Sequence, residues 1–292
     1  MGKQQKLKDG RKHIARRLEV LKRIDLPYPY DLAKMPAGEA LVSIYAEAAG
    51  RISECMADAV TPHSLKQAVH AALLYLDELL HQVPTTVEFA DIGWQTVACR
   101  AGCNHCCTIR VTTTGPIVLA LASHLKKRLT PEQFASLLER LRAHSEQGLA
   151  LAPIEQVLKG RMCPLNVDGL CVGYEYRPNT CRSYHSMSVA QCEADRADPF
   201  AENVVYQDPQ RMGMNALVSR ALTACTCGFG LNDDELELVP ALLISLTEDS
   251  VAERYISGEP VFASAHSPEV IGAQLRDLSK RGVRLLPQVP SR

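Results

Sequence analysis

Cysteine is the residue type whose spacing in this sequence most clearly supports chemistry. Four cysteines lie within the nine residues Cys99-Arg-Ala-Gly-Cys103-Asn-His-Cys106-Cys107. Thiolates that are two to four residues apart can converge on one metal ion, because a tight turn points both side chains inward. Gly102 permits such a turn between Cys99 and Cys103. This segment is therefore predicted to bind metal.

A second set of cysteines is more widely spaced. Four thiolates satisfy a tetrahedral zinc ion and also a [4Fe–4S] cluster. Eight cysteines could therefore serve two four-thiolate centres or one polynuclear centre. The expected cofactor is zinc, iron or an iron–sulfur cluster, and adjacent cysteines favour iron slightly because they suit a polynuclear arrangement. The predicted metal ligands are Cys99, Cys103, Cys106, Cys107, Cys163, Cys171, Cys181 and Cys192.

Cys106 and Cys107 add a constraint because they are adjacent in the chain. In an extended stretch, neighbouring side chains face opposite sides of the backbone. We therefore expect these two thiols to bind different metals, or one of them not to be a ligand.

Other residues near the cysteines could assist them. Arginines beside the ligands could offset the negative charge of a four-thiolate site, and His105 or His185 could replace a cysteine in a mixed site. Cys55 lies in an apolar helical pattern and is expected in the core. The roles of Cys225 and Cys227 stay open between ligand, labile disulfide and structural residue. The arginines in question are Arg100, Arg110, Arg177 and Arg182.

Together, the two cysteine groups resemble the cysteine-cluster family of zinc- or iron-chelating proteins, the CxxCxxCC or YkgJ-like family. The resemblance covers residues 99–192 and includes the segments Cys163-Pro-Leu, Asp168-Gly-Leu-Cys171 and Tyr174-Glu-Tyr-Arg-Pro-Asn-Thr-Cys181-Arg. The first gap here holds three residues, where the family's motif has two. The resemblance implies metal chelation. Some members are similar to the flagellin lysine N-methylases, although this chain has no glycine-rich nucleotide-binding motif.

Composition excludes several classes of protein. The chain has 292 residues, 46% of them hydrophobic, and a formal net charge of -1. These values are typical of a globular protein, and the near-zero charge makes nucleic acid an unexpected partner. No apolar run approaches the roughly 18 to 20 residues that span a bilayer, so no membrane contact is expected. The basic start lacks a following apolar stretch, which favours a cytoplasmic protein with reduced thiols.

The elements that must position the cysteines are mostly helical. Apolar periodicity and Thr-Pro or Gly-Pro starts predict helices over 38–59, from 62 to before 84, over 115–129, from 131, and over 209–224 and 234–247. A basic helix is expected within 1–25, a connector at 27–30, a strand or extended segment over 85–98, and a last helix over 267–282. Residues 162–194 lack apolar periodicity and are expected to be irregular. We expect a mostly α protein with a central loop-rich cysteine-cluster metal-binding core.

Three regions are expected in the chain. They are an N-terminal helical region with a basic start at 1–90, the cysteine-cluster core at 91–195, and a C-terminal helical region packed on the core at 196–292. Three functions remain open. The chain could be a metal-binding protein with a structural or sensory cluster, an iron–sulfur-dependent enzyme such as a protein lysine N-methylase-like methyltransferase, or a metal-handling or adaptor protein with a protein partner.

Overall fold

The computed structural model of the chain describes residues 38–149, 160–197 and 205–266. This part of the chain is mostly α-helical, as the sequence predicts, and its strands occur only as short antiparallel pairs. No helix in the described ranges is long and apolar enough to cross a membrane. The expected basic helix within 1–25, the connector at 27–30 and the last helix over 267–282 lie outside the described residues.

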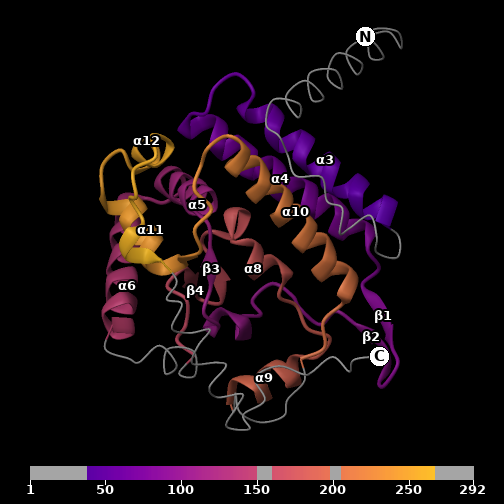
Figure 1. The fold of residues 1–292 in the computed structure, drawn as a ribbon. Coiled ribbons are helices and arrows are strands. Elements are labelled where there is room, and N and C mark those ends of the chain that lie inside the picture. The colour runs from indigo at the N-terminus through magenta and orange to yellow at the C-terminus, as the bar shows by residue number, and fades with distance from the viewer. Residues whose placement is uncertain (1–37, 150–159, 198–204, 267–292) are drawn as a thin grey trace, which may run out of the picture.

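Three long helices, α3 (Gly38–Met56), α4 (Pro62–Gln82) and α10 (Pro209–Gly228), lie side by side and contact one another (Figure 1). Helix α4 begins as predicted, because the Thr61 side chain accepts from the Ser64 backbone and the Ser64 hydroxyl accepts from the Thr61 backbone. It ends at Gln82, before the proline at position 84. Helix α10 begins where Asp208 accepts from the Gln210 backbone N–H at 2.8 Å.

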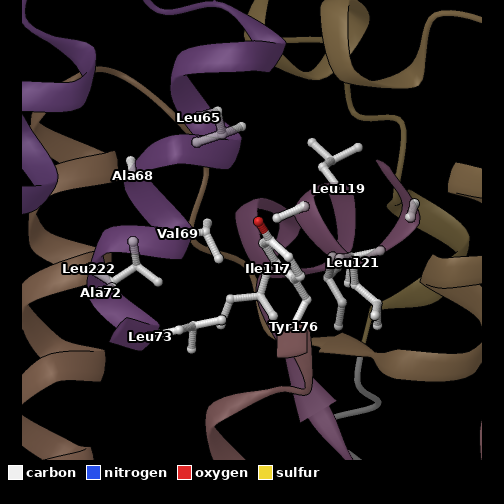
Figure 2. Packing of buried hydrophobic residues seen from close by; sticks show 14 of the residues in the cluster. Leu65, Ala68, Val69, Ala72, Leu73, Ile117, Leu119, Leu121, Tyr176 and Leu222 are labelled. Carbon is white, nitrogen blue, oxygen red and sulfur yellow. The ribbon is translucent and has the colours of Figure 1, made fainter. Parts of the chain in front are cut away.

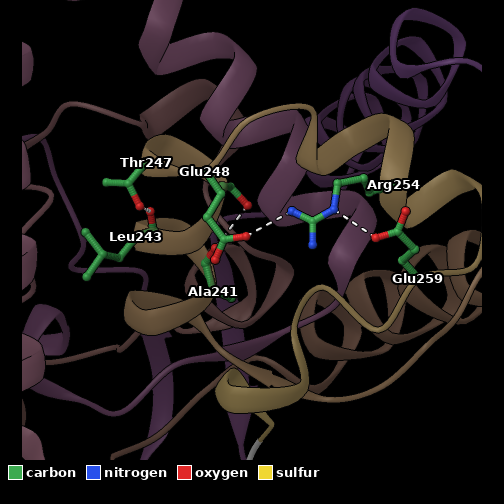
Figure 3. Close-up of polar contacts among 7 residues, drawn as sticks. Ala241, Leu243, Thr247, Glu248, Arg254 and Glu259 are labelled. Carbon is green, nitrogen blue, oxygen red and sulfur yellow. Dashed lines mark hydrogen bonds and ion pairs between the residues drawn. The ribbon is translucent and has the colours of Figure 1, made fainter.

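A second set of helices packs around α11 (Leu238–Thr247) and includes α5 (Gly115–Arg128). It also contains α6 (Pro131–Leu149) and the short α12 (Val251–Ile256). Helix α6 follows the predicted start, with Thr130 and Gln133 exchanging side-chain to backbone hydrogen bonds. Helix α11 begins later than predicted, because β6 (Leu236–Glu237) pairs with β3 (Thr112–Thr113). Figure 3 shows Arg254 of α12 paired with Glu248 and Glu259, which ties α12 to the end of α11.

The hydrophobic core lies where α4, α5 and α10 meet (Figure 2). Leu65, Val69 and Leu73 of α4 are at most 1% exposed, as the predicted apolar face requires. Tyr176, from the cysteine-rich segment, enters the same core between the rings of His70 and His124, with centroid distances of 5.5 and 4.9 Å. The core therefore anchors the central segment to the helices.

The remaining elements are short and belong to the cysteine-rich centre. The stretch over 85–98 forms a hairpin of β1 (Thr86–Phe89) and β2 (Gly93–Thr96), which is more regular than the single strand or extended segment expected there. The stretch over 162–194 is largely irregular, as predicted, and holds β4 (Asn166–Val167), β5 (Leu170–Cys171), the 3-10 turn η2 (Tyr174–Tyr176) and α8 (Asn179–Ser183). The prediction is wrong at its end, where α9 (Val189–Ala197) is a regular helix.

Candidate metal centre

The first cysteine segment is shaped by two consecutive turns. The Cys103 backbone N–H donates to the Arg100 carbonyl at 3.0 Å, and Gly102 takes a φ of +83°. This left-handed conformation is the one for which glycine was expected at this position. The 3-10 turn η1 (His105–Thr108) follows and carries Cys106 and Cys107.

The second segment is shaped by the β4–β5 hairpin. Asp168 and Gly169, its two central residues, have φ values of +51° and +84°, as in a type I′ turn. The Asn166 side chain accepts from the Gly169 backbone N–H at 3.2 Å and holds the turn closed. The hairpin thereby brings Cys171 back beside the strand that follows Cys163.

Backbone hydrogen bonds join the two segments. The Cys163 N–H donates to the Cys107 carbonyl at 2.7 Å, and the Ala98 N–H donates to the Ser186 carbonyl at 2.9 Å. The Ser186 N–H in turn donates to the Cys99 sulfur at 3.3 Å. Residues about 60 to 90 positions apart in the chain are therefore held together at both ends of the first segment.

Four of the predicted ligands form what we call the inner group. Each of the six pairs among them lies close enough to interact electrostatically, and the four side chains are partly buried. Burial, with repulsion from neighbouring thiolates, raises the pKa of the Cys163 and Cys181 thiols to about 12. The inner group is Cys107, Cys163, Cys171 and Cys181.

The other four predicted ligands form what we call the outer group. Cys99 interacts electrostatically with each of the other three members and is itself exposed. The thiol of Cys99 is nevertheless partly shielded from water, which raises its pKa, and the hydrogen bond from Ser186 opposes that effect. Cys192 is placed by α9, which packs on η1. The outer group is Cys99, Cys103, Cys106 and Cys192.

Cys106 and Cys107 lie where the two groups meet. A side-chain hydrogen bond between the two residues lowers the pKa of Cys107 to about 6 and raises the pKa of Cys106. The Asn166 amide also donates to the Cys107 sulfur at 3.5 Å. Cys107 interacts with each of the other inner cysteines, whereas Cys106 interacts with Cys99 and Cys181.

Among the four arginines expected near the site, Arg177 is the one that acts on the thiols. Its charge lowers the pKa of Cys99, Cys107, Cys171 and Cys181 and so opposes burial, which raises the pKa of these thiols. Its guanidinium lies 4.1 Å from the Tyr174 ring centre. The other three arginines face elsewhere. Arg182 pairs with Asp77 at 2.7 Å, Arg110 pairs with Glu237, and Arg100 is exposed.

The two candidate histidines, His185 and His105, differ in whether a ring nitrogen is available to bind metal. His185 uses both ring nitrogens, since Nδ1 lies 2.6 Å from the Ser183 carbonyl and Nε2 accepts from the Asp208 backbone N–H at 2.7 Å. Both nitrogens are therefore occupied, which leaves none for a metal. His105 Nε2 lies 3.6 Å from a Glu193 carboxylate oxygen, and its buried Nδ1 has no hydrogen-bond partner in the described part of the chain.

The remaining cysteines lie apart from both groups. Cys55 packs against the hydrophobic core, which confirms the expectation for it. Cys225 is fully buried, with its sulfur 3.3 Å from the Ser53 hydroxyl. Cys227 is exposed near the end of α10. All 11 cysteines lie in the described ranges, and none of them forms a disulfide there.

The donor set suits a thiophilic metal, although its atoms are not gathered to ligating distance. Within the described ranges, no three or more Cys, His, Asp or Glu side chains are close enough together to hold a metal ion. Binding thus requires the thiols to draw together.

Sequence reasoning missed Asn166 and Ser186, which donate to Cys107 and Cys99; the Asn-Val-Asp-Gly turn pattern was the signal that could have indicated Asn166.

We found no match to this chain among protein-family models, curated proteins or solved structures.

Proposed function

We propose that the chain is a cytoplasmic metal-binding protein that holds zinc or iron, the latter alone or in an iron–sulfur cluster, through its eight central cysteines. The observation that carries this proposal is the mutual proximity of the four inner cysteines, which come from three separate parts of the chain. Resemblance to the cysteine-cluster chelating family points in the same direction.

Metal binding would offset the unfavourable ionisation of the clustered thiols. Burial combined with repulsion from neighbouring thiolates opposes the ionisation of Cys99, Cys163, Cys171 and Cys181. A divalent cation reverses this balance because it binds the thiolate form and displaces the proton. Arg177 supplies a fixed positive charge beside both groups, which helps to offset the excess negative charge of four thiolates on one ion.

The division into two groups favours two centres over one. Cys107 interacts with all three other inner cysteines, and we assign the adjacent Cys106 to the outer group through Cys99, although Cys106 also interacts with Cys107 and Cys181. This agrees with the expectation that adjacent thiols bind different metals. In this proposal the inner group holds one centre and the outer group holds the other.

The two centres would differ in accessibility, which favours metal handling as a second candidate function. Cys99 is exposed and is fixed chiefly through Ser186, whereas the inner cysteines are partly buried and surround the β4–β5 hairpin. We therefore assign the structural role to the inner centre. The outer centre is the one from which a protein partner would receive or deliver metal.

The test compares Cys106→Ser, Cys107→Ser and the matched control Cys227→Ser in protein purified without oxygen. Metal and acid-labile sulfide per chain are measured before and after a limited treatment with chelator. We expect Cys106→Ser to keep the chelator-resistant metal and Cys107→Ser to lose it, while Cys227→Ser matches the parent. Equal losses in Cys106→Ser and Cys107→Ser would reject two centres, and a metal-free parent protein would reject the function.

A further inference from the structure

A cavity of about 520 Å³ lies beside the inner group and is not used by the proposed metal centre. Its walls come from the segment that follows Cys107, from helices α6 and α11, and from Arg161 and Cys163. This volume is within the roughly 300 to 1,000 Å³ that is typical of small-molecule sites.

Both arginines that line the cavity, Arg110 and Arg161, have buried hydrogen-bond donors without an acceptor in the described part of the chain. Arg110 pairs with Glu237, yet its Nε and Nη1 have no hydrogen-bond partner in the described part of the chain. Arg161 donates to the His144 carbonyl through Nη1, and its Nε is likewise without a partner. A buried donor without an acceptor costs about 1 to 3 kcal/mol, so a ligand acceptor that reached these nitrogens would be stabilising.

The charged side chains that line the cavity favour an anionic ligand. The lining holds two guanidinium groups and one carboxylate, that of Glu237. Burial and the neighbouring Arg161 lower the pKa of His144 to about 4, so His144 is neutral at pH 7. His266 also lines the cavity, and its Nε2 lies 3.2 Å from an Asp234 carboxylate oxygen. Within the lining, positive charge therefore exceeds negative charge by one, and Glu235, outside the lining, also interacts with Arg110.

The wall of the cavity that α11 forms is apolar and well fixed. Leu238, Leu243 and Ile244 of α11 line it. The start of α11 is held by a hydrogen bond from the Leu238 N–H to the Val111 carbonyl at 3.1 Å, and its end by the Arg254 ion pairs in Figure 3. An apolar group could lie against this wall without displacing secondary structure.

We propose that this cavity binds a small organic anion, in which a carboxylate or phosphate group contacts Arg110 and Arg161 and an apolar chain lies along α11. Planar guanidinium groups match both head groups through paired hydrogen bonds. The ligand would lie beside Cys163 and hence next to the inner metal centre. Binding of the anion does not depend on the metal, so the two proposals can fail separately.

The test is calorimetric titration of the full-length protein with octanoate and with octyl phosphate, using octanol and octylammonium as matched uncharged and cationic probes. We expect one site per chain for at least one anion, with at least tenfold weaker binding of both matched probes. A preference between the two anions identifies the head group. Failure of both anions to bind, or equal binding of octanol, would overturn the proposal.

Variants locate the site. Arg161→Gln and Arg110→Gln should each weaken anion binding at least tenfold, whereas Arg142→Gln, on the exposed surface of α6, should not change it. Leu243→Trp, which fills the cavity and leaves its charge intact, should also abolish binding. Circular dichroism and metal content are measured for each variant to identify misfolding. Anion binding of parental strength in both Arg161→Gln and Leu243→Trp would contradict the assignment.

Discussion

At the scale of single residues, Arg177 is the charged group most closely tied to the proposed metal centre. It acts on members of both cysteine groups, and its guanidinium stacks on Tyr174. Of the four arginines that the sequence places near cysteines, Arg182 and Arg110 are paired with carboxylates instead. Position along the chain therefore did not distinguish the arginine that faces the thiols from those that face away.

We expect Arg177→Gln to lower metal affinity about tenfold, because the thiolates lose the positive charge that faces them. Competition with a chromogenic chelator measures this affinity. Arg100→Gln is the matched control, since Arg100 lies beside Cys99 in the sequence but is exposed. An unchanged affinity in Arg177→Gln, or an equal loss in Arg100→Gln, would show that Arg177 does not support the thiolates.

His144 gives a pH dependence that is separate from the cysteines. Its pKa is about 4 in the folded protein, against 6.5 for the ordinary side chain. The unfolded chain therefore takes up the proton first, and stability falls as the pH drops from 6.5 towards 4. After allowance for partial exposure, we expect His144 to account for about 1 kcal/mol of the loss between pH 7 and pH 5.

Urea unfolding of the parent and of His144→Gln at both pH values measures this contribution. Acid also protonates the thiolates, but that loss is common to both proteins and cancels in the comparison. The variant should lose about 1 kcal/mol less than the parent. Equal losses would mean that His144 has an ordinary pKa in the folded state.

At the scale of elements, the link between the cysteine-rich segment and the helical core is η2. Tyr176 anchors this turn between His70 and His124, and Gly173 precedes it directly. A Cβ atom at position 173 would lie 2.6 Å from Leu121 Cδ1, which is far inside van der Waals contact. An alanine at position 173 would therefore force the Leu121 side chain, or the turn itself, to move.

We expect Gly173→Ala to lower the free energy of unfolding by about 1 to 3 kcal/mol, because Leu121 is fully buried and cannot move away freely. Gly213→Ala is the control: this glycine lies in α10 with open space around it, so alanine should raise stability by up to about 1 kcal/mol. Urea denaturation measures both variants. A Gly173→Ala protein as stable as the parent would show that the turn can shift away from α5.

Local chemistry explains which elements could be predicted from the sequence. The starts of α4 and α6 follow from Thr-Pro pairs whose threonines cap the helix, and these signals lie within four residues. The late start of α11 depends on pairing between β3 and β6, which are more than 120 residues apart. Helix α9 was missed because it is short and has no buried residues.

The same reasoning applies to the candidate site. Cysteine spacing predicts the candidate ligands, and that prediction stays open; the spacing could not assign Cys107 to the inner group or Cys192 to the outer group. That assignment depends on long-range contacts, such as the hydrogen bond between Cys163 and Cys107 and the packing of α9 on η1. The cavity beside α11 is likewise formed by segments that the sequence does not link.

At the scale of the whole molecule, one hydrophobic core joins helices from both ends of the described chain. Ile52 of α3, Leu76 of α4 and Leu222 of α10 belong to it, as does Tyr176 from the cysteine-rich centre. The cysteine-rich centre is therefore anchored to a core that the helices share; in the proposed function, metal would order the loops that carry the cysteines. In the proposed function, metal is bound by sulfur alone.

The measurement that tests this claim most directly is X-ray absorption of the anaerobically purified protein, combined with metal and sulfide analysis. We expect zinc or iron in amounts stoichiometric with the chain, and we expect the ligand atoms around the metal to be sulfur only, at about 2.3 Å. Protein without metal, or metal whose neighbours are mainly nitrogen and oxygen, would contradict this claim.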